Sequence, residues 1–363
     1  MVFVLTAMSM TAFGQKVGGF DAELEAIRAK HQLPALAALA MIGGEVRVNG
    51  AVGLRRLGGT EPVTRNDKWH IGSCTKSMTA TLAAMLVEQG ALRWDTRVGE
   101  VFPELRESMD PMWAPVTLEM LLSHRGGAPA KAPENLWRNA WARSGTVAEQ
   151  RTSFVNGLLL RRPESEPGTK YIYSNQGYTI AGAMLERATR KPWEELMRTM
   201  LFASCNMTSA GFGAPASLGQ VDQPWGHEGA ELRPVGPGPG ADNPPAIGPA
   251  ATVHATLTDF ARYAALHAVG DRLGTLFLKR DGFRKLHTAP DGQDYALGWV
   301  VAPRPWAGGD ALTHVGSNMN FLFVVWIAPA KDAVFVAATN CAGAGAEKAT
   351  DEAVSLLIGK LLR

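Results

Sequence analysis

The chain has 363 residues, of which 46% are hydrophobic and 19% are charged, and its formal net charge at pH 7 is +2. This length and apolar content allow a substantial core in one or two domains, and the nearly balanced charge excludes a strongly basic nucleic-acid-binding surface. The cysteines are too few and too widely spaced for a disulfide framework or a metal site, so we expect three small buried side chains and no metal or other cofactor. They are Cys74, Cys205 and Cys341.

The N-terminus is a short apolar stretch, residues 1–15, that ends in Ala-Phe-Gly-Gln. One interpretation is a signal peptide with a small-residue cleavage site, although a positively charged start is missing; the alternative is a mis-started N-terminus or a packed terminal strand. Residues 1–14 are therefore a candidate signal segment. A signal peptide would imply a periplasmic or secreted protein, and its absence a cytoplasmic one. No other apolar run reaches the roughly 18 residues of a membrane span.

The next elements are a helix and a hairpin. Apolar spacing predicts a helix over residues 20–32, which Pro34 stops, and a hairpin over residues 35–55 that turns at Gly43-Gly44. A second helix is predicted to begin at Ser73, because apolar residues recur at helical spacing from Met78 onward.

Ser73 and Lys76 form a Ser-x-x-Lys pair at this helix start. Residues three apart share a helix face, so the lysine can reach the serine hydroxyl and act as its base. The N-terminal end of a helix also favours developing negative charge. The alternative is a plain capping serine followed by a solvated lysine, since the motif alone is short enough to arise by chance.

Tyr173 and Asn175 form a Tyr-x-Asn motif after the turn at Pro167-Gly168 and before an apolar-periodic helix at about residues 177–189. A loop of this kind can overhang a cleft, where a tyrosine can pass a proton to a leaving group and an asparagine can hold a substrate amide or ester. Helix capping by Ser174 or Asn175 is a compatible interpretation.

His124, His227 and His314 are each followed two residues later by glycine. We favour His314 as functional, because it precedes a strand-like run over residues 320–328 and Gly316 would let a substrate approach the backbone. His124 is expected to serve the C-terminal dipole of a helix, and His227 to lie in a loop.

The rest of the chain completes an α/β (α+β) fold. Residues 233–250 are rich in Pro and Gly and are expected to form a surface loop near the cleft, and Thr256 caps another helix. Strands are expected at residues 295–301, 320–328 and 332–339, and a final helix at 346–362. The prediction is an antiparallel sheet built from both chain ends and flanked by helices, with an inserted helical subdomain and the site in the cleft between them. Within a domain at 15–363, the sheet part covers about 15–68 and 285–363 and the helical part about 69–284.

Taken together and in this order, the motifs resemble those of the class C β-lactamase-like serine hydrolases, a family that also includes penicillin-binding-protein-like DD-peptidases, D-aminopeptidases and carboxylesterases. The resemblance extends from about residue 20 to the C-terminus. It rests on residues 71–77, 116–124, 167–169, 173–175, 258–263, 297–299 and 314–317.

The resemblance implies roles for the motif residues. Ser73 would be the acylated nucleophile, Lys76 its general base and Tyr173 a second acid/base partner. Asn175 would bind the acyl side chain, and the backbone N–H groups of Ser73 and Ser317 would form the oxyanion hole. His314 and Gly316 would occupy the third motif. Which of Lys76 and Tyr173 accepts the proton first stays open.

One departure from the family affects substrate choice. The β-lactamases of this family usually have Lys-Thr-Gly or Lys-Ser-Gly in the third motif, where this chain has His314-Val315-Gly316. A neutral imidazole and an apolar side chain bind a substrate carboxylate more weakly than an ammonium and a hydroxyl. The implied function is a serine hydrolase for small-molecule esters or amides. The alternatives are a β-lactamase, a D-aminopeptidase or DD-peptidase, and a non-catalytic binder of peptidoglycan fragments. The sequence does not predict an oligomeric state.

Overall fold

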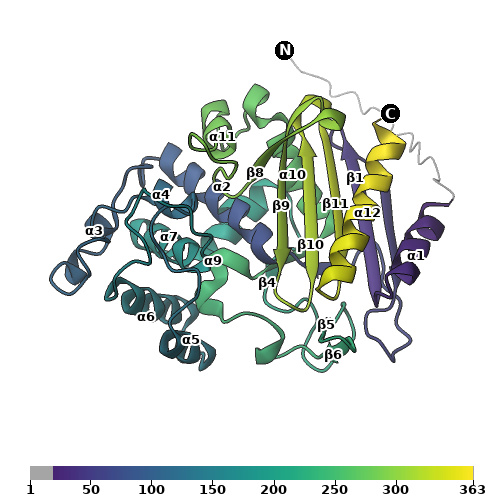
Figure 1. Ribbon diagram of the computed structural model, residues 1–363, viewed down its shortest axis with the longest axis horizontal. Coiled ribbons are helices and arrows are strands. Elements are labelled where there is room, and N and C mark those ends of the chain that lie inside the picture. The colour runs from purple at the N-terminus through teal and green to yellow at the C-terminus, as the bar shows by residue number, and fades with distance from the viewer. Residues whose placement is uncertain (1–18, 363) are drawn as a thin grey trace, which may run out of the picture.

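The computed structural model describes residues 19–362 and is built around a six-stranded antiparallel sheet to which both ends of the chain contribute (Figure 1). The predicted arrangement of a two-ended antiparallel sheet flanked by helices is confirmed. In sheet order the strands are β2 (Glu45–Gly53), β1 (Ala35–Ile42), β11 (Ala333–Thr339), β10 (Leu322–Ala328), β9 (Gly309–Ser317) and β8 (Val300–Arg304).

Helices cover both faces of this sheet, which explains why β1 and β11 are almost wholly apolar. Side chains alternate along a strand, so Leu36 and Ala38 pack with the terminal helices α1 (Phe20–Lys30) and α12 (Ala344–Leu361). Leu39 and Met41 point to the opposite face, which α10 (Leu257–Leu273) covers. The predicted hairpin and both terminal helices are therefore present, with ends within three residues of the expectation.

The helical part of the chain lies to one side of the sheet, around α2 (Thr75–Glu88), whose first twelve residues are all buried (Figure 1). Because α2 is enclosed on all sides, it brings the start of the nucleophile segment into the middle of the molecule. The other helices are α3 (Val98–Val101), α4 (Leu118–Leu122), α5 (Glu134–Trp141), α6 (Val147–Leu159), α7 (Asn175–Thr189), α8 (Trp193–Leu196), α9 (Gly248–Ala251) and α11 (Arg280–His287).

Two small sheets complete the framework. One contains β3 (Lys68–His70), β7 (Val253–Thr256) and β4 (Gly211–Phe212), and the other pairs β5 (Gly226–Glu228) with β6 (Arg233–Val235). Strand β3 leads directly into the turn that carries Ser73, so the first small sheet anchors that turn.

The strand expected at residues 295–301 is wrong in its position. Strand β8 begins only at Val300, because Gly298 has φ +87° and the chain turns back there, with Ala296 N–H donating to the carbonyl of Trp299 at 2.8 Å. A side chain at Gly298 would lie 2.5 Å from the Cα of Ser77. The turn is therefore shaped by its contact with α2.

The Pro- and Gly-rich segment at residues 233–250 differs in part from the expected surface loop. Its first half includes β6 and exposed residues, but Ala246, Ile247 and Ala250 are fully or almost fully buried and Asp242 is 6% exposed. The second half is thus a core segment, and it packs next to the nucleophile turn.

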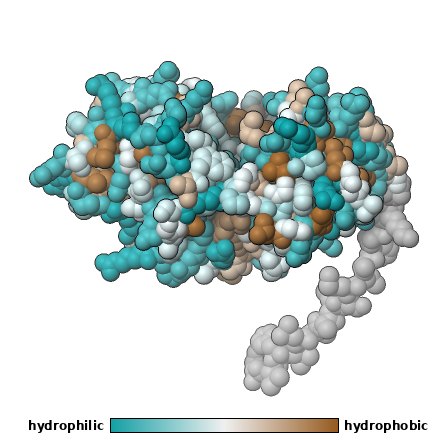
Figure 2. Space-filling view, turned by 90° about the horizontal axis from the view of Figure 1, so that it is seen from below, coloured by the Kyte–Doolittle hydropathy of each residue, from teal (hydrophilic) through white to brown (hydrophobic). Residues whose placement is uncertain are grey.

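The face of the molecule shown in Figure 2 is mostly hydrophilic, with small scattered apolar patches. Within residues 19–362 there is no helix both long enough and apolar enough to cross a membrane. The candidate signal segment lies outside the described residues, and the proposed division into sheet and helical parts stays a prediction.

Candidate active site

Ser73 lies in a single 3-10 turn, Gly72–Cys74, between β3 and α2. Gly72 has φ +50°, a left-handed conformation that glycine adopts without strain. A side chain at Gly72 would overlap the backbone N of Ser317, and one at Gly316 would overlap the carbonyl oxygen of Ile71. Two glycines therefore allow the end of β9 to lie directly against the nucleophile turn, which brings the N–H groups of Ser73 and Ser317 together.

Lys76 contacts the nucleophile candidate from the first turn of α2. Its Nζ lies 3.0 Å from Ser73 Oγ, 2.7 Å from Asn175 Oδ1 and 3.1 Å from the carbonyl oxygen of Ala250. The side chain is completely buried, which contradicts the alternative interpretation of a solvated lysine.

Burial lowers the pKa of Lys76 to about 7, since the charged ammonium loses its hydration. A neutral amine has two N–H groups and one lone pair. With the N–H groups donated to Asn175 Oδ1 and to the Ala250 carbonyl, the lone pair points to the Ser73 hydroxyl. This arrangement fits a general base.

Tyr173 lies on the other side of Ser73. Its hydroxyl faces the Ser73 side chain, and its ring centre lies 4.7 Å from Lys76 Nζ. Although 38% of Tyr173 is exposed, desolvation raises its pKa well above the ordinary value, an effect that outweighs the opposing influence of Ser73. The hydroxyl is therefore protonated at neutral pH and able to donate a proton.

Asn175 is the first residue of α7, and Ser174 caps that helix by accepting the N–H of Gly177 at 3.2 Å. The capping interpretation is thus confirmed for Ser174. Asn175 Oδ1 is already held by Lys76. Its predicted role as a ligand for the acyl side chain stays a prediction that would fall to the Nδ2 group.

His314 is buried on β9, in the predicted position beside Ser73. Its Nδ1 lies 2.8 Å from the carbonyl oxygen of Val315 and its Nε2 lies 3.3 Å from the Tyr295 hydroxyl, so Nδ1 carries the proton and Nε2 accepts. Burial, and secondly the charge of Lys76, lower the pKa of His314 to about 3. The third motif is therefore uncharged, and Val315 beside it is half exposed.

The expectation for His124 is wrong, because this residue belongs to the site. Helix α4 ends at Leu122, and His124 has φ +59°, which turns its ring into the molecule. The ring centre lies 4.4 Å from that of Tyr173, and Nδ1 accepts the N–H of Ser174 at 3.1 Å. Burial lowers the pKa of His124 well below its ordinary value. A neutral ring cannot serve the helix dipole, and it braces the Tyr173 loop instead.

The remaining sequence predictions concern the cysteines and His227. All three cysteines are buried and carry free thiols. His227 lies in β5 rather than in a loop, with its ring hydrogen-bonded to the backbone of Leu57 and Asn340, a structural role. In residues 19–362 no cluster of three or more His, Cys, Asp or Glu side chains has the arrangement of a metal site.

Comparison with known proteins agrees with this geometry. Penicillin-binding protein 4 of Amycolatopsis lactamdurans is 28% identical over 67% of this chain and 61% of its own length. A lovastatin esterase of Penicillium rubens is 28% identical over 47% of this chain and 46% of its own length. The chain thus spans less than two thirds of the length of either relative.

The structural comparison covers almost the whole fold. A solved class C β-lactamase superposes with a TM-score of 0.76 at 20% identity, over 95% of this chain and 95% of the other. The family model named Beta-lactamase matches residues 20–360. The resemblance inferred from the motifs is confirmed, and the chain belongs to the β-lactamase family.

Proposed function

We propose that this chain is a serine hydrolase that forms and then hydrolyses an acyl-enzyme on Ser73, with small esters as its preferred substrates. The observation that carries the proposal is the contact between Ser73 Oγ and a buried lysine whose pKa lies near neutrality. A serine hydroxyl becomes an effective nucleophile when such a base accepts its proton.

Acylation begins when Ser73 Oγ attacks the substrate carbonyl carbon and its proton passes to the lone pair of Lys76. The carbonyl oxygen becomes an oxyanion, and the N–H groups of Ser73 and Ser317 are arranged to stabilise it. Each such donor is worth about a hundredfold to a thousandfold in rate.

Breakdown of the tetrahedral intermediate requires a proton on the leaving oxygen. The protonated Tyr173 hydroxyl donates it and is reprotonated by the Lys76 ammonium, so the site returns to its starting charge with Ser73 acylated. Water then attacks the acyl-enzyme carbonyl carbon and gives one proton to the Lys76 lone pair. The bond between that carbon and Ser73 Oγ breaks, the proton passes from Lys76 to Oγ, and the acid product leaves.

The third motif supports a neutral substrate. A β-lactam or D-peptide presents a carboxylate, and a cation would bind it by a charge-assisted hydrogen bond. Here His314 is uncharged and Val315 offers no hydroxyl. An ester without a carboxylate loses nothing at such a site, and the similarity to an esterase agrees with this preference.

The test compares initial rates on p-nitrophenyl butyrate and on a chromogenic cephalosporin for the parent and for Ser73→Ala. Ester turnover that depends on Ser73 and exceeds cephalosporin turnover is the expected result. Faster cephalosporin turnover would overturn the ester preference and favour the β-lactamase or peptidase alternative. Equal ester rates for the parent and Ser73→Ala would refute Ser73 as the nucleophile.

The role of Lys76 has a separate test. Arginine stays protonated in proteins, so Lys76→Arg should lose at least a hundredfold in kcat/KM, within the range of general-base catalysis. Activity within tenfold of the parent would contradict a basic role for this lysine.

A further inference from the structure

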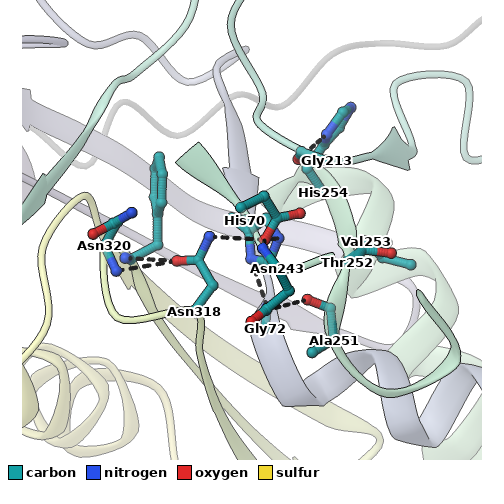
Figure 3. A network of polar contacts seen from close by, with 12 residues as sticks. His70, Gly72, Gly213, Asn243, Ala251, Thr252, Val253, His254, Asn318 and Asn320 are labelled. Carbon is teal, nitrogen blue, oxygen red and sulfur yellow. Dashed lines mark hydrogen bonds and ion pairs between the residues drawn. The ribbon is translucent and has the colours of Figure 1, made fainter. Parts of the chain in front are cut away.

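A buried polar network lies behind the nucleophile turn, and Figure 3 labels its residues His70, Gly72, Asn318 and Asn320. Its centre is His70, the last residue of β3, which is completely buried. His70 Nδ1 accepts the N–H of Gly72 at 3.1 Å. With Nδ1 accepting, the ring proton lies on Nε2, and this atom is 2.9 Å from Asp242 Oδ1, an ion-pair distance without the alignment of a hydrogen bond.

Asp242 connects His70 to two other segments. The same Oδ1 accepts the side-chain Nδ2 of Asn318 at 3.1 Å and the backbone N–H of Asn243 at 2.7 Å. Asn318 directly follows Ser317, and its own Oδ1 accepts the N–H groups of Asn320 and Phe321 at 3.2 and 3.0 Å, respectively. The network therefore joins the turn before Ser73, the Pro- and Gly-rich segment, and the loop after Ser317.

These are the two backbone segments whose N–H groups form the proposed oxyanion hole. Gly72 immediately precedes Ser73 and holds a left-handed conformation, and Asn318 immediately follows Ser317. A displacement of one segment relative to the other would change the distance between the two donors. A buried carboxylate is costly unless its partners are well placed, so a site that retains one against a histidine needs a reason beyond packing.

We propose that His70 and Asp242 are positioning residues that hold the N–H donors of Ser73 and Ser317 in register for the oxyanion. This inference rests on the proposed function, since it assigns the network to that same hydrolytic site. His70 fixes the Ser73 side of the hole through Gly72, and Asp242 fixes the Ser317 side through Asn318.

The network predicts a loss in the chemical step with little change in ground-state binding. His70→Ala and Asp242→Ala should each lower kcat on p-nitrophenyl butyrate about tenfold to a hundredfold, less than complete loss of one donor, with KM within about threefold. The rate at which a fluorophosphonate probe labels Ser73 should fall in parallel, because phosphonylation develops negative charge at the same place. The pH midpoint of kcat/KM should not move, since Lys76 is untouched.

Conservative variants separate the two halves of the contact. His70→Asn keeps an acceptor where Nδ1 accepts the Gly72 N–H, and His70→Gln keeps a donor directed at Asp242. Asp242→Asn keeps the Oδ1 acceptor but removes the charge. Each should recover part of the activity lost in the corresponding alanine variant.

His254 provides a matched control. It pairs with His70 across β3 and β7, is almost fully buried, and has its Nδ1 at 2.9 Å from the carbonyl oxygen of Gly213 rather than near the nucleophile turn. His254→Ala thus removes an equivalent imidazole from the same small sheet, and its kcat per folded molecule should stay within about threefold of the parent. Unfolding curves for every variant give the folded fraction by which rates are corrected.

The outcomes distinguish the two proposals. A parent that is not labelled at Ser73 by the probe would overturn the proposed function and this inference with it. If the parent is labelled but His70→Ala has the same corrected kcat and labelling rate as His254→Ala, only the positioning role fails. A loss that appears in KM and not in kcat would also refute it.

Discussion

The contact between Asn175 and Lys76 gives a direct way to test the base. Replacing Asn175 by aspartate retains the shape of the side chain but places a carboxylate at the position where Oδ1 now accepts from Lys76 Nζ at 2.7 Å. The negative charge favours the ammonium form of the lysine, so the pKa of Lys76 should rise.

The size of the effect follows from the pKa of Lys76. An opposite charge at this separation raises an amine pKa by about 1 to 3 units, which would move Lys76 from about 7 to about 8 to 10. At pH 7 about half of the lysine is neutral in the parent, whereas in Asn175→Asp the neutral share is roughly one tenth to one thousandth. We therefore expect kcat/KM at pH 7 to fall about 5-fold to 500-fold and to recover as the pH rises.

The assay is the pH dependence of kcat/KM for p-nitrophenyl butyrate, corrected for spontaneous hydrolysis. Asn175→Ala is the control, because it removes the same hydrogen bond without adding charge. The midpoint should lie near pH 7 for the parent, at or below that value for the alanine variant, and at least about one unit higher for the aspartate variant. The same midpoint for Asn175→Asp and Asn175→Ala would refute Lys76 as the group that controls activity.

Three further predictions concern specificity, stability and backbone contact. His314→Lys combined with Val315→Thr restores a cation and a hydroxyl in the third motif, so the ratio of cephalosporin to ester kcat/KM should rise at least about tenfold; an unchanged ratio would contradict the specificity argument. Lys76→Met removes the buried amine. The pKa of Lys76 is about 7 in the folded chain and near 10.5 in the unfolded chain, so the unfolding free energy of the parent rises with pH between pH 7 and 10.5. The unfolding free energy of Lys76→Met minus that of the parent should therefore fall by about 1.4 kcal/mol per pH unit in this window, as measured by denaturant titration, and a constant difference would disprove the shifted pKa. Gly316→Ala forces a Cβ against the backbone of Ile71, so the rate at which the fluorophosphonate probe labels Ser73 should drop at least about a hundredfold. Gly240→Ala is the control, because the space around its Cβ is open and its labelling rate should equal that of the parent. Equal labelling rates for the two variants would show that β9 does not contact the turn tightly.

Local patterns predicted most of the elements that position the site. Apolar spacing and turn residues, which are patterns only a few residues long, predicted three of these elements. They are the hairpin of β1 and β2, the start of α2 and the final helix. The Ser73–Lys76 contact follows in the same way, because side chains three positions apart lie close together on one face of a helix. The strand expected at residues 295–301 failed because the turn at Gly298 is imposed by α2, more than two hundred positions earlier.

The sequence by itself therefore determined the family, the two-ended sheet and the identity of Ser73, Lys76, Tyr173 and His314 as site candidates. Only the tertiary structure decided their chemistry. The low pKa of Lys76 comes from enclosure by α7 and the segment around Ala250, and the neutrality of His314 comes from burial in the same enclosure. The brace of His124 on the Tyr173 loop and the contact of His70 with Asp242 join residues about 50 and 170 positions apart. Local periodicity describes a few turns of chain, whereas desolvation and long-range contacts depend on which segments pack together.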